Sequence, residues 1–330
     1  MKIAFYGTKP YDRIWFEPLA ADYGFELRFI ELPCKEETIA LAEGYDAICI
    51  FVNDYVDKKL IDKLYEMGVK AILLRSAGFN HVDVRAAQGK VAVLRVPSYS
   101  PEAVAEFAVT LLLAVNRHIH KAYNRTRDFN MSLNGLMGSD LNHKVAGVVG
   151  TGKIGQAMIR ILKGFGMQVL AYDPYPAEEV QAEYVPLEEL ISRADVISLH
   201  CPLTADTKNL ICRESIARMK EGVYLINTSR GGLIDTEALI EGLLQKKFAG
   251  VGLDVYDEEE GIFYEDCSED IIEDENLARL MTFPNVIITS HMGFFTMEAM
   301  QAIAIETLEN AYALENGLPL VNSVQLSGQT

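Results

Sequence analysis

The chain has 330 residues, 49% of them hydrophobic, and a formal net charge of −17 from 47 acidic and 30 basic side chains. This length allows two domains, and this hydrophobic fraction is ordinary for a soluble globular protein. The acidic balance argues against a nucleic-acid-binding or anionic-membrane surface, because either one needs a basic patch.

The N-terminal segment enters a short apolar run directly, without the features of a signal peptide. The longest apolar segment, residues 103–115, contains Glu106 and is too short to span a bilayer. Five cysteines without a C-x-x-C spacing are typical of free reduced thiols. We therefore expect a cytoplasmic protein without a membrane segment.

Residues 1–99 alternate short apolar runs with amphipathic segments such as residues 56–67. The apolar runs, which we expect to be strands, are residues 2–6, 25–31, 46–51, 71–75 and 91–96. Strand–helix alternation predicts a parallel, doubly wound sheet. This part of the chain has no G-x-G-x-x-G motif, so we expect it to differ in kind from a cofactor domain.

Pro97 and Pro101 mark the first expected domain boundary, since proline stops a strand and suits the first turn of a helix. A single long helix is expected from Pro101 to about Asp128, apolar in its first half and basic in its second. His118 and His120 in this helix are two residues apart and do not share a face, so we expect no metal site there.

A glycine motif follows the apolar run 145–149 and precedes a helical pattern. Strand, G-x-G-x-x-G and helix is the context of a dinucleotide-binding fingerprint. Gly150 permits the tight turn, Gly152 lets the backbone approach a pyrophosphate, and Gly155 lets the helix pack on the strand. The N-terminus of that helix, which begins with Lys153 and Ile154, holds the anion.

The next apolar run, residues 168–172, ends at Asp173, about 20 residues on, where a carboxylate can bind the ribose hydroxyls. No arginine follows Asp173, which favours NAD over NADP. Further strands are expected at residues 194–200, 223–228, 249–256 and 286–290, and helices at 187–192, 215–219, 236–247 and 297–314. Six strands from 145 to 290 match a complete Rossmann fold.

We therefore predict an α/β protein of two doubly wound parallel-sheet domains with a cleft between them. Residues 1–99 form a flavodoxin-like substrate domain, and residues 100–298 form an internal Rossmann NAD-binding domain. Residues 299–330 are a C-terminal helix and tail that return to the substrate domain.

Several polar residues stand at expected strand ends. Arg230, followed by two glycines, can bind a carboxylate bidentately. Asp254 lies in a run that otherwise looks buried, and a buried Asp is rare unless it is paired or functional. Glu259 cannot be distinguished from its acidic neighbours as a solvated charge. His291 and His200 are equal candidates for proton exchange near neutral pH.

Motifs along nearly the whole chain resemble the D-2-hydroxyacid dehydrogenase family. They are residues 74–83, 96–106, 148–155, 223–231 and 252–256 with Glu259, and 289–291. The loop 261–266 and the segments 160–166 and 198–202 look most like the fermentative D-lactate dehydrogenases of that family.

The resemblance implies a role for each part of the site. Arg230 binds the carboxylate of a 2-oxo acid, His291 is the general acid/base, and Glu259 pairs with that histidine. The substrate pocket is lined by Ser76, Ala77, Gly78 and Tyr99. Further cofactor contacts are Cys201, Pro202, Thr207, Thr228, Ser229 and Asp254. His200 becomes a structural or cofactor-proximal residue. After the histidine, fermentative relatives have a glutamine where this chain has Met292, a difference that bears on the size and polarity of the substrate pocket.

The function that the resemblance implies is reversible hydride transfer from NADH to pyruvate, giving D-lactate, in a homo-oligomer that is a dimer or tetramer. A larger 2-oxo acid is the alternative substrate. A formate dehydrogenase is disfavoured, because that branch pairs its histidine with an amide and this chain offers Glu259. An NAD-sensing corepressor-like protein is the alternative of another class, since a fold does not fix a function.

Overall fold

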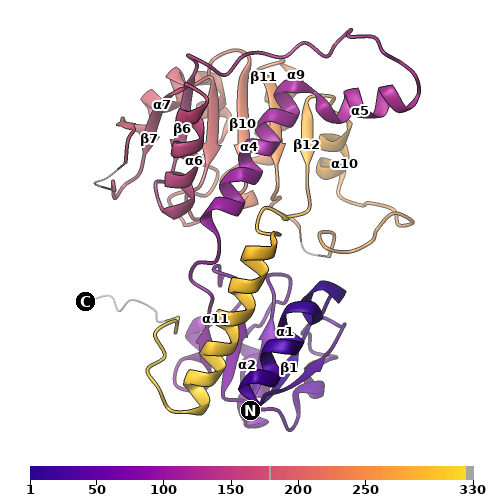
Figure 1. The fold of residues 1–330 in the computed structure, drawn as a ribbon, viewed down its shortest axis with the longest axis vertical. Helices are drawn as coiled ribbons and strands as arrows, with labels where there is room; N and C mark the ends of the chain where they lie inside the picture. Colours follow the sequence, from indigo (N-terminus) through magenta and orange to yellow (C-terminus); the bar gives the residue numbers. More distant parts are fainter. Residues whose placement is uncertain (178–179, 260, 325–330) are drawn as a thin grey trace. The chain divides into compact units, whose positions relative to one another are not determined.

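The computed structural model describes residues 1–177, 180–259 and 261–324, and the chain divides into two compact units. The first unit comprises Met1–Ser100 and Phe295–Thr330, and the second unit comprises Pro101–Phe294 (Figure 1). These limits differ from the expected boundaries by one residue at the first crossing and four at the second. The assignment of substrate binding to the first unit stays a prediction.

The first unit is built on a parallel sheet with the strand order β2-β1-β3-β4-β5. Its strands are β1 (Lys2–Phe5), β2 (Glu26–Phe29), β3 (Ala47–Ile50), β4 (Ala71–Leu74) and β5 (Ala92–Leu94). Each lies inside one of the expected apolar runs. Every residue of β3 and β4 is buried, as expected for inner strands covered on both faces. This order is that of the flavodoxin-like fold, so the fold class predicted for this part is confirmed.

Helices cover this sheet. They are α1 (Pro10–Tyr23), α2 (Lys58–Glu66), α3 (Val84–Ala87) and α11 (Met297–Glu315), together with the short 3₁₀ helix η1 (Ile39–Ala42). The Asp57 side chain accepts a 2.9 Å hydrogen bond from Leu60 N, which caps the N-terminus of α2. The C-terminal helix α11 packs against α1 (Figure 1).

The second unit contains a parallel sheet that has seven strands in the described part of the chain. The strands are β6 (Val145–Val149), β7 (Gln168–Tyr172), β8 (Glu183–Tyr184), β9 (Val196–Leu199), β10 (Val223–Asn227), β11 (Phe248–Leu253) and β12 (Val286–Ile288). Their order, β12-β11-β10-β9-β6-β7-β8, is that of a Rossmann fold with one added edge strand. The expected number of six was wrong, because β8 has two residues and no alternation to reveal it.

The helices of the second unit are α4 (Pro101–Arg117), α5 (Ile119–Arg127), α6 (Lys153–Gly164), α7 (Leu187–Arg193), α8 (Arg213–Arg218), η2 (Gly231–Leu233), α9 (Thr236–Leu244) and α10 (Glu275–Thr282). The expectation of one helix from residue 101 to 128 was wrong. The chain turns at His118, which has φ 51° and ψ 32°, so α4 and α5 are separate. The apolar α4 packs against α6 and β11.

The cysteines are free, as expected: Cys34, Cys49, Cys201, Cys212 and Cys267. Burial raises the pKa of the Cys49 thiol to about 12 and that of Cys201 to about 11, so neither is a reactive thiolate near neutral pH. In the residues that the structure describes, no helix is long and apolar enough to cross a bilayer. The same residues contain no group of three or more metal-binding side chains.

Candidate active site

The glycine motif forms a turn that fits closely against its surroundings. Gly150 has φ +94°, and a Cβ added there would lie 2.6 Å from the backbone nitrogen of Cys201. A Cβ at Gly155 would lie 1.9 Å from the carbonyl oxygen of Gly150. The turn therefore abuts the end of β9, and α6 packs directly on the turn. Backbone atoms exclude a side chain at Gly150 and at Gly155, because moving the backbone to make room would cost free energy.

The N-terminus of α6 is open to a ligand. The helix starts at Lys153 after Gly152, which has no side chain to cap it, and a Cβ at Gly152 would meet no described atom within 4 Å. The first N–H groups of a helix, here including that of Ile154, lack intrahelical partners and lie at the positive end of the dipole. The residues present thus fit a bound pyrophosphate, as the sequence predicts.

Asp173 is fixed beside this turn, directly after β7. Its Oδ2 accepts hydrogen bonds from Thr151 N (2.6 Å) and Thr151 Oγ1 (3.1 Å), and its Oδ1 accepts one from Tyr175 N (2.9 Å). The Tyr184 hydroxyl lies 3.0 Å from Thr151 Oγ1 and donates to it. Thr151 and Tyr184 were not predicted as site residues, and only the place of Thr151 inside the glycine motif could have indicated one of them.

Except for Asp254, which follows β11, the remaining expected cofactor contacts lie beyond the carboxyl ends of β9 and β10. Ser229 Oγ donates to the carbonyl of Cys201 (2.7 Å), and Thr207 Oγ1 donates to that of Pro202 (2.7 Å). The hydroxyl of Thr228 is buried and has no hydrogen-bond partner among the described atoms. A buried polar atom left without a partner is costly, which suits a position completed by a ligand.

Replacing Gly155 with Ala is expected to destabilise the protein by roughly 1–3 kcal/mol, the range for overpacking, because its Cβ overlaps the Gly150 carbonyl. The displaced turn should also weaken NADH binding by about tenfold or more. Urea unfolding and fluorescence titration with NADH measure the two effects. Gly164→Ala is the matched control, since Gly164 also lies in α6 and a Cβ there meets nothing within 4 Å. Equal NADH affinity in both variants would contradict this account of the turn.

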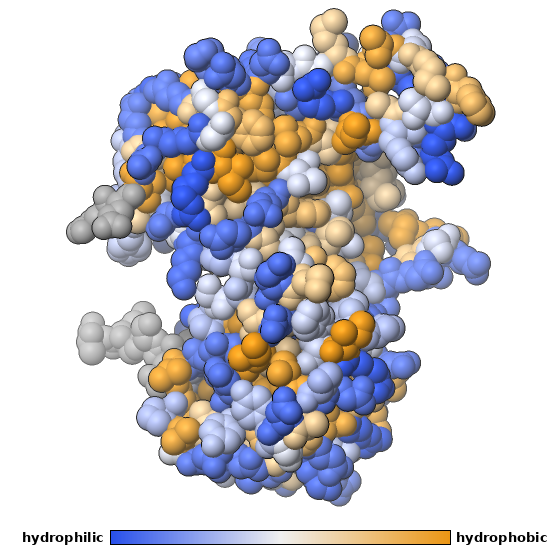
Figure 2. Space-filling view, in the orientation of Figure 1, coloured by the Kyte–Doolittle hydropathy of each residue, from blue (hydrophilic) through white to orange (hydrophobic). Residues whose placement is uncertain are grey.

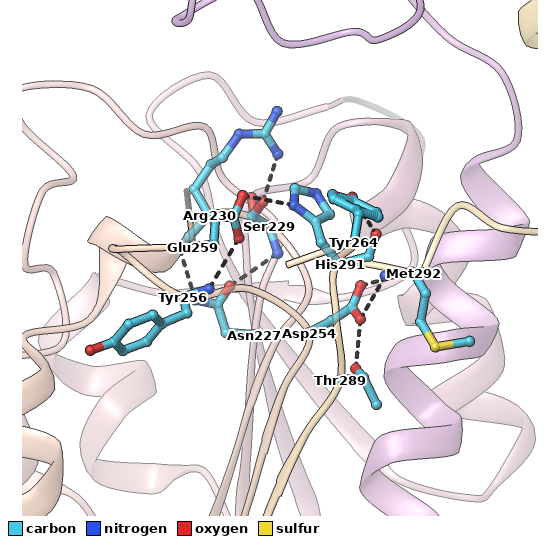
Figure 3. Close-up of polar contacts among 11 residues, drawn as sticks. Asn227, Ser229, Arg230, Asp254, Tyr256, Glu259, Tyr264, Thr289, His291 and Met292 are labelled. Carbon is cyan, nitrogen blue, oxygen red and sulfur yellow. Dashed lines mark hydrogen bonds and ion pairs between the residues drawn. The ribbon is translucent and has the colours of Figure 1, made fainter. Parts of the chain in front are cut away.

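His291, which follows β12 after Thr289 and Ser290, is held at three points (Figure 3). Its Nδ1 lies 2.9 Å from Glu259 Oε1, its backbone N donates to the Asp254 carbonyl (2.7 Å), and its own carbonyl accepts from the Tyr264 hydroxyl (2.8 Å). The backbone has φ 53°, a left-handed conformation uncommon outside glycine. The side chain is 15% exposed, so the imidazole is partly shielded from water.

Asp254 organises the segment that carries His291. Its Oδ1 accepts from Met292 N (2.9 Å) and Thr289 Oγ1 (2.6 Å), and its Oδ2 accepts from Gly293 N (2.7 Å). The side chain is buried, and burial raises the pKa of the carboxyl. The carboxylate thus holds the loop around the histidine, and its expected contact with the cofactor stays a prediction.

Arg230 follows β10 at a turn shaped by Asn227. Asn227 Nδ2 donates to the Arg230 carbonyl (2.8 Å), and its Oδ1 accepts from Ser229 N (3.0 Å), while Arg230 Nη1 donates to the Ser229 carbonyl (2.6 Å). A Cβ at Gly231 would lie 2.0 Å from the carbonyl carbon of Tyr256, so only glycine allows this turn to approach the β11 loop. Asn227 was not predicted, although an amide in an otherwise apolar strand is the signal for it.

These side chains come together because β10, β11 and β12 are neighbours in the sheet. The carboxyl ends of parallel strands meet at one edge, where open α/β sheets bind ligands. Figure 3 shows Arg230, Glu259 and His291 next to one another at this edge. A guanidinium with an imidazole–carboxylate pair can bind an acid group and exchange a proton beside it.

In the first unit, Ser76, Ala77 and Gly78 follow β4. Ser76 Oγ donates to the Gly78 carbonyl (2.8 Å), and Arg95 Nη1 donates to that of Ala77 (3.0 Å). Tyr99 lies beyond β5, the strand paired with β4, so it stands at the same edge of that sheet. Arg95, which fixes the turn, was not predicted. The substrate-binding roles of the four expected residues stay predictions.

His200, an equal candidate by position alone, lies apart from this chemistry at the end of β9. Its Nε2 is 2.8 Å from Ser198 Oγ, and desolvation lowers the pKa of the imidazole to about 4. It is therefore neutral near physiological pH. The family resemblance predicted a structural or cofactor-proximal role for His200, whereas its position in the sequence alone did not.

The neutral His200 predicts a pH dependence of stability. An unfolded histidine has a pKa of about 6.5, so between pH 6.5 and about 4 the unfolded chain binds more protons than the native one. The free energy of unfolding should fall by up to about 3 kcal/mol from this residue as the pH drops through that window. Urea unfolding at pH 6.5 and 4.5 should give a smaller difference for His200→Asn than for wild type. His143→Asn, at an exposed histidine, should keep the wild-type difference; an unchanged difference in His200→Asn would contradict the prediction.

Comparison with known proteins identifies the family. Residues 109–293 match the model for the D-isomer specific 2-hydroxyacid dehydrogenase, NAD binding domain. The D-lactate dehydrogenase of Escherichia coli is 49% identical over 321 residues, covering 96% of this chain and 98% of that protein. Its apo-structure has a TM-score of 0.90 at 46% identity, with 98% and 100% of the two chains covered. The pyruvate reductase of Chlamydomonas reinhardtii has a TM-score of 0.92 at 43% identity, with 98% of each chain covered. The chain therefore belongs to the D-isomer specific 2-hydroxyacid dehydrogenase family and is an NAD-dependent oxidoreductase.

Proposed function

We propose that this protein reduces pyruvate to D-lactate with NADH, reversibly. The observation that carries the proposal is the pairing of His291 Nδ1 with Glu259 Oε1 at 2.9 Å, at the sheet edge where Arg230 also lies. The names of two similar proteins, a D-lactate dehydrogenase and a pyruvate reductase, support this substrate. The D configuration of the product rests on that similarity alone.

In the proposed mechanism, Arg230 binds the substrate carboxylate through its planar fork and fixes the keto carbon in one orientation. NADH, when bound, would supply a hydride, with its electron pair, to that carbon. His291 donates a proton to the carbonyl oxygen, so the alkoxide becomes a hydroxyl and the ring becomes neutral. Glu259 accepts the Nδ1 hydrogen bond, which leaves Nε2 to exchange the proton.

The reverse reaction uses the same groups. A neutral His291 accepts the hydroxyl proton of the 2-hydroxy acid, and NAD, when bound, would take up the hydride. Asp254 keeps the loop 289–293 in place through its three hydrogen bonds, so the imidazole need not reorganise between the two directions.

A larger 2-oxo acid is the second candidate, which Met292 favours. Met292 directly follows the proposed acid/base in the chain, and its apolar side chain is 40% exposed. A NADH-oxidation assay with pyruvate and with branched-chain, aromatic and dicarboxylic 2-oxo acids decides between them. We expect the highest kcat/KM with pyruvate and a D product by chiral analysis. A large preference for a bulky acid would overturn the lactate assignment, and no oxidation with any acid would favour an NAD-sensing binding protein.

We also propose that the chain forms a homo-oligomer, as expected. The support is an exposed apolar segment comprising α5 and the residues up to 137, visible in Figure 2 as orange atoms at the upper right. Its exposed large side chains are Ile119, Tyr123, Phe129, Met131, Leu133 and Met137. Such a patch marks an interaction surface. We infer that a second copy of the chain covers this patch, because the segment is basic and the chain as a whole has a net charge of −17. Light scattering, which measures the molecular mass in solution, tests for the oligomer. The cytoplasmic location of the protein stays a prediction.

A further inference from the structure

We propose that Tyr264 is a positioning residue for His291, acting through its hydroxyl on the histidine backbone. This inference rests on the proposed function of His291 as the proton donor. The Tyr264 hydroxyl donates a 2.8 Å hydrogen bond to the carbonyl of His291, and the two ring centroids are 6.2 Å apart (Figure 3). Tyr264 itself does not touch the reacting atoms in this scheme, so it is not a catalytic residue.

The backbone of His291 needs such support. Its φ of 53° lies in the left-handed region, which a non-glycine residue occupies only when its surroundings hold it there. The N–H of His291 is bound by the Asp254 carbonyl on one side, and its C=O is bound by the Tyr264 hydroxyl on the other. Removing one of these two contacts frees one end of the strained residue.

The loop that carries Tyr264 is the same loop that carries Glu259. The backbone N–H groups of Ile262 and Phe263 donate to the Glu259 carbonyl at 3.2 and 3.0 Å, so these two residues turn back toward Glu259. Phe263 is buried in the core of the second unit and anchors this turn. Tyr264 follows with φ 68°, a second left-handed residue.

This loop therefore binds His291 at two points, the ring through Glu259 and the backbone through Tyr264. The two contacts support each other, because a rotation of the His291 backbone also moves Nδ1 away from the carboxylate. The hydroxyl should thus keep the imidazole in the orientation in which Nδ1 faces Glu259 and Nε2 faces the substrate. Loss of the hydroxyl should lower the fraction of molecules in that orientation.

Tyr264→Phe tests the inference, since it removes only the hydroxyl. We expect kcat for oxo-acid reduction to fall about three- to tenfold, the effect of one hydrogen bond, while KM and the NADH dissociation constant stay within about twofold. The matched control is Tyr6→Phe, in the first unit, whose hydroxyl also donates to backbone carbonyls, those of Thr38 and Ile39. It should keep the wild-type kcat. A double variant with Glu259→Gln should show less than the product of the two single effects, because both residues act through His291.

A readout without substrate keeps this inference separate from the proposed function. In ¹⁵N-histidine NMR, the His291 ring signals, assigned by their loss in His291→Asn, should be sharp in wild type and broadened or shifted in Tyr264→Phe. Unchanged signals or an unchanged kcat would overturn the positioning role, and so would a loss of thermal stability with wild-type kcat. Wild-type enzyme that reduces no 2-oxo acid would instead overturn the proposed function, and the NMR comparison would still decide whether Tyr264 positions the histidine.

Discussion

His291→Asn is expected to lower kcat for 2-oxo-acid reduction by about 10²- to 10⁴-fold, the contribution of a general acid. The amide cannot donate a proton of suitable acidity to the developing alkoxide. Asparagine is chosen because it tolerates the left-handed backbone at φ 53°, so the loop held by Asp254 should keep its conformation. NADH binding should be nearly intact, because the expected cofactor contacts lie on other strand ends.

Steady-state kinetics and NADH fluorescence titration measure these two quantities. His143→Asn is the matched control, since His143 is exposed and also has a positive φ of 64°. It should leave both quantities unchanged. A His291→Asn enzyme that retained a tenth or more of the wild-type kcat would show that the proton comes from elsewhere.

Arg230→Lys is expected to lower kcat/KM for pyruvate by about 10²-fold, mainly through KM, because lysine keeps the charge but cannot form the two parallel hydrogen bonds of the fork. The turn shaped by Asn227 and Gly231 should remain, since neither contact uses the guanidinium. Initial rates over a range of pyruvate concentrations at saturating NADH give the change.

The control is Arg213→Lys. Arg213 binds Glu241 through Nε and Nη2 on an exposed helix of the same unit. The substitution therefore removes a comparable pair of guanidinium hydrogen bonds far from the strand ends. It should leave the kinetics at the wild-type level. Wild-type kinetics in Arg230→Lys would mean that the assigned substrate fork is wrong.

Expectations based on local sequence patterns agree with the structure where the pattern was a long apolar run or a glycine spacing. The run 145–149 became β6, and backbone atoms exclude a side chain at two of the glycines that follow, Gly150 and Gly155. The continuous helix from 101 to 128 failed, because a single residue, His118, leaves the helical region and nothing in its sequence pattern marks it. The two-residue strand β8 was missed because its pairing with β7 is a tertiary event.

The sequence by itself determined two α/β units, a dinucleotide turn at residues 150–155 and an acidic side chain after β7. These follow from short-range rules: the period of apolar residues, the backbone freedom of glycine and the offset to the next strand. The functional triplet was readable only through a family resemblance, since Glu259 looks like any solvated acid among its neighbours. Only the tertiary structure decided that Glu259 faces His291, that Asp254 holds the histidine loop and that Tyr264 binds its carbonyl. Those contacts join residues more than 25 positions apart, and they arise from the order β12-β11-β10, which no local pattern encodes.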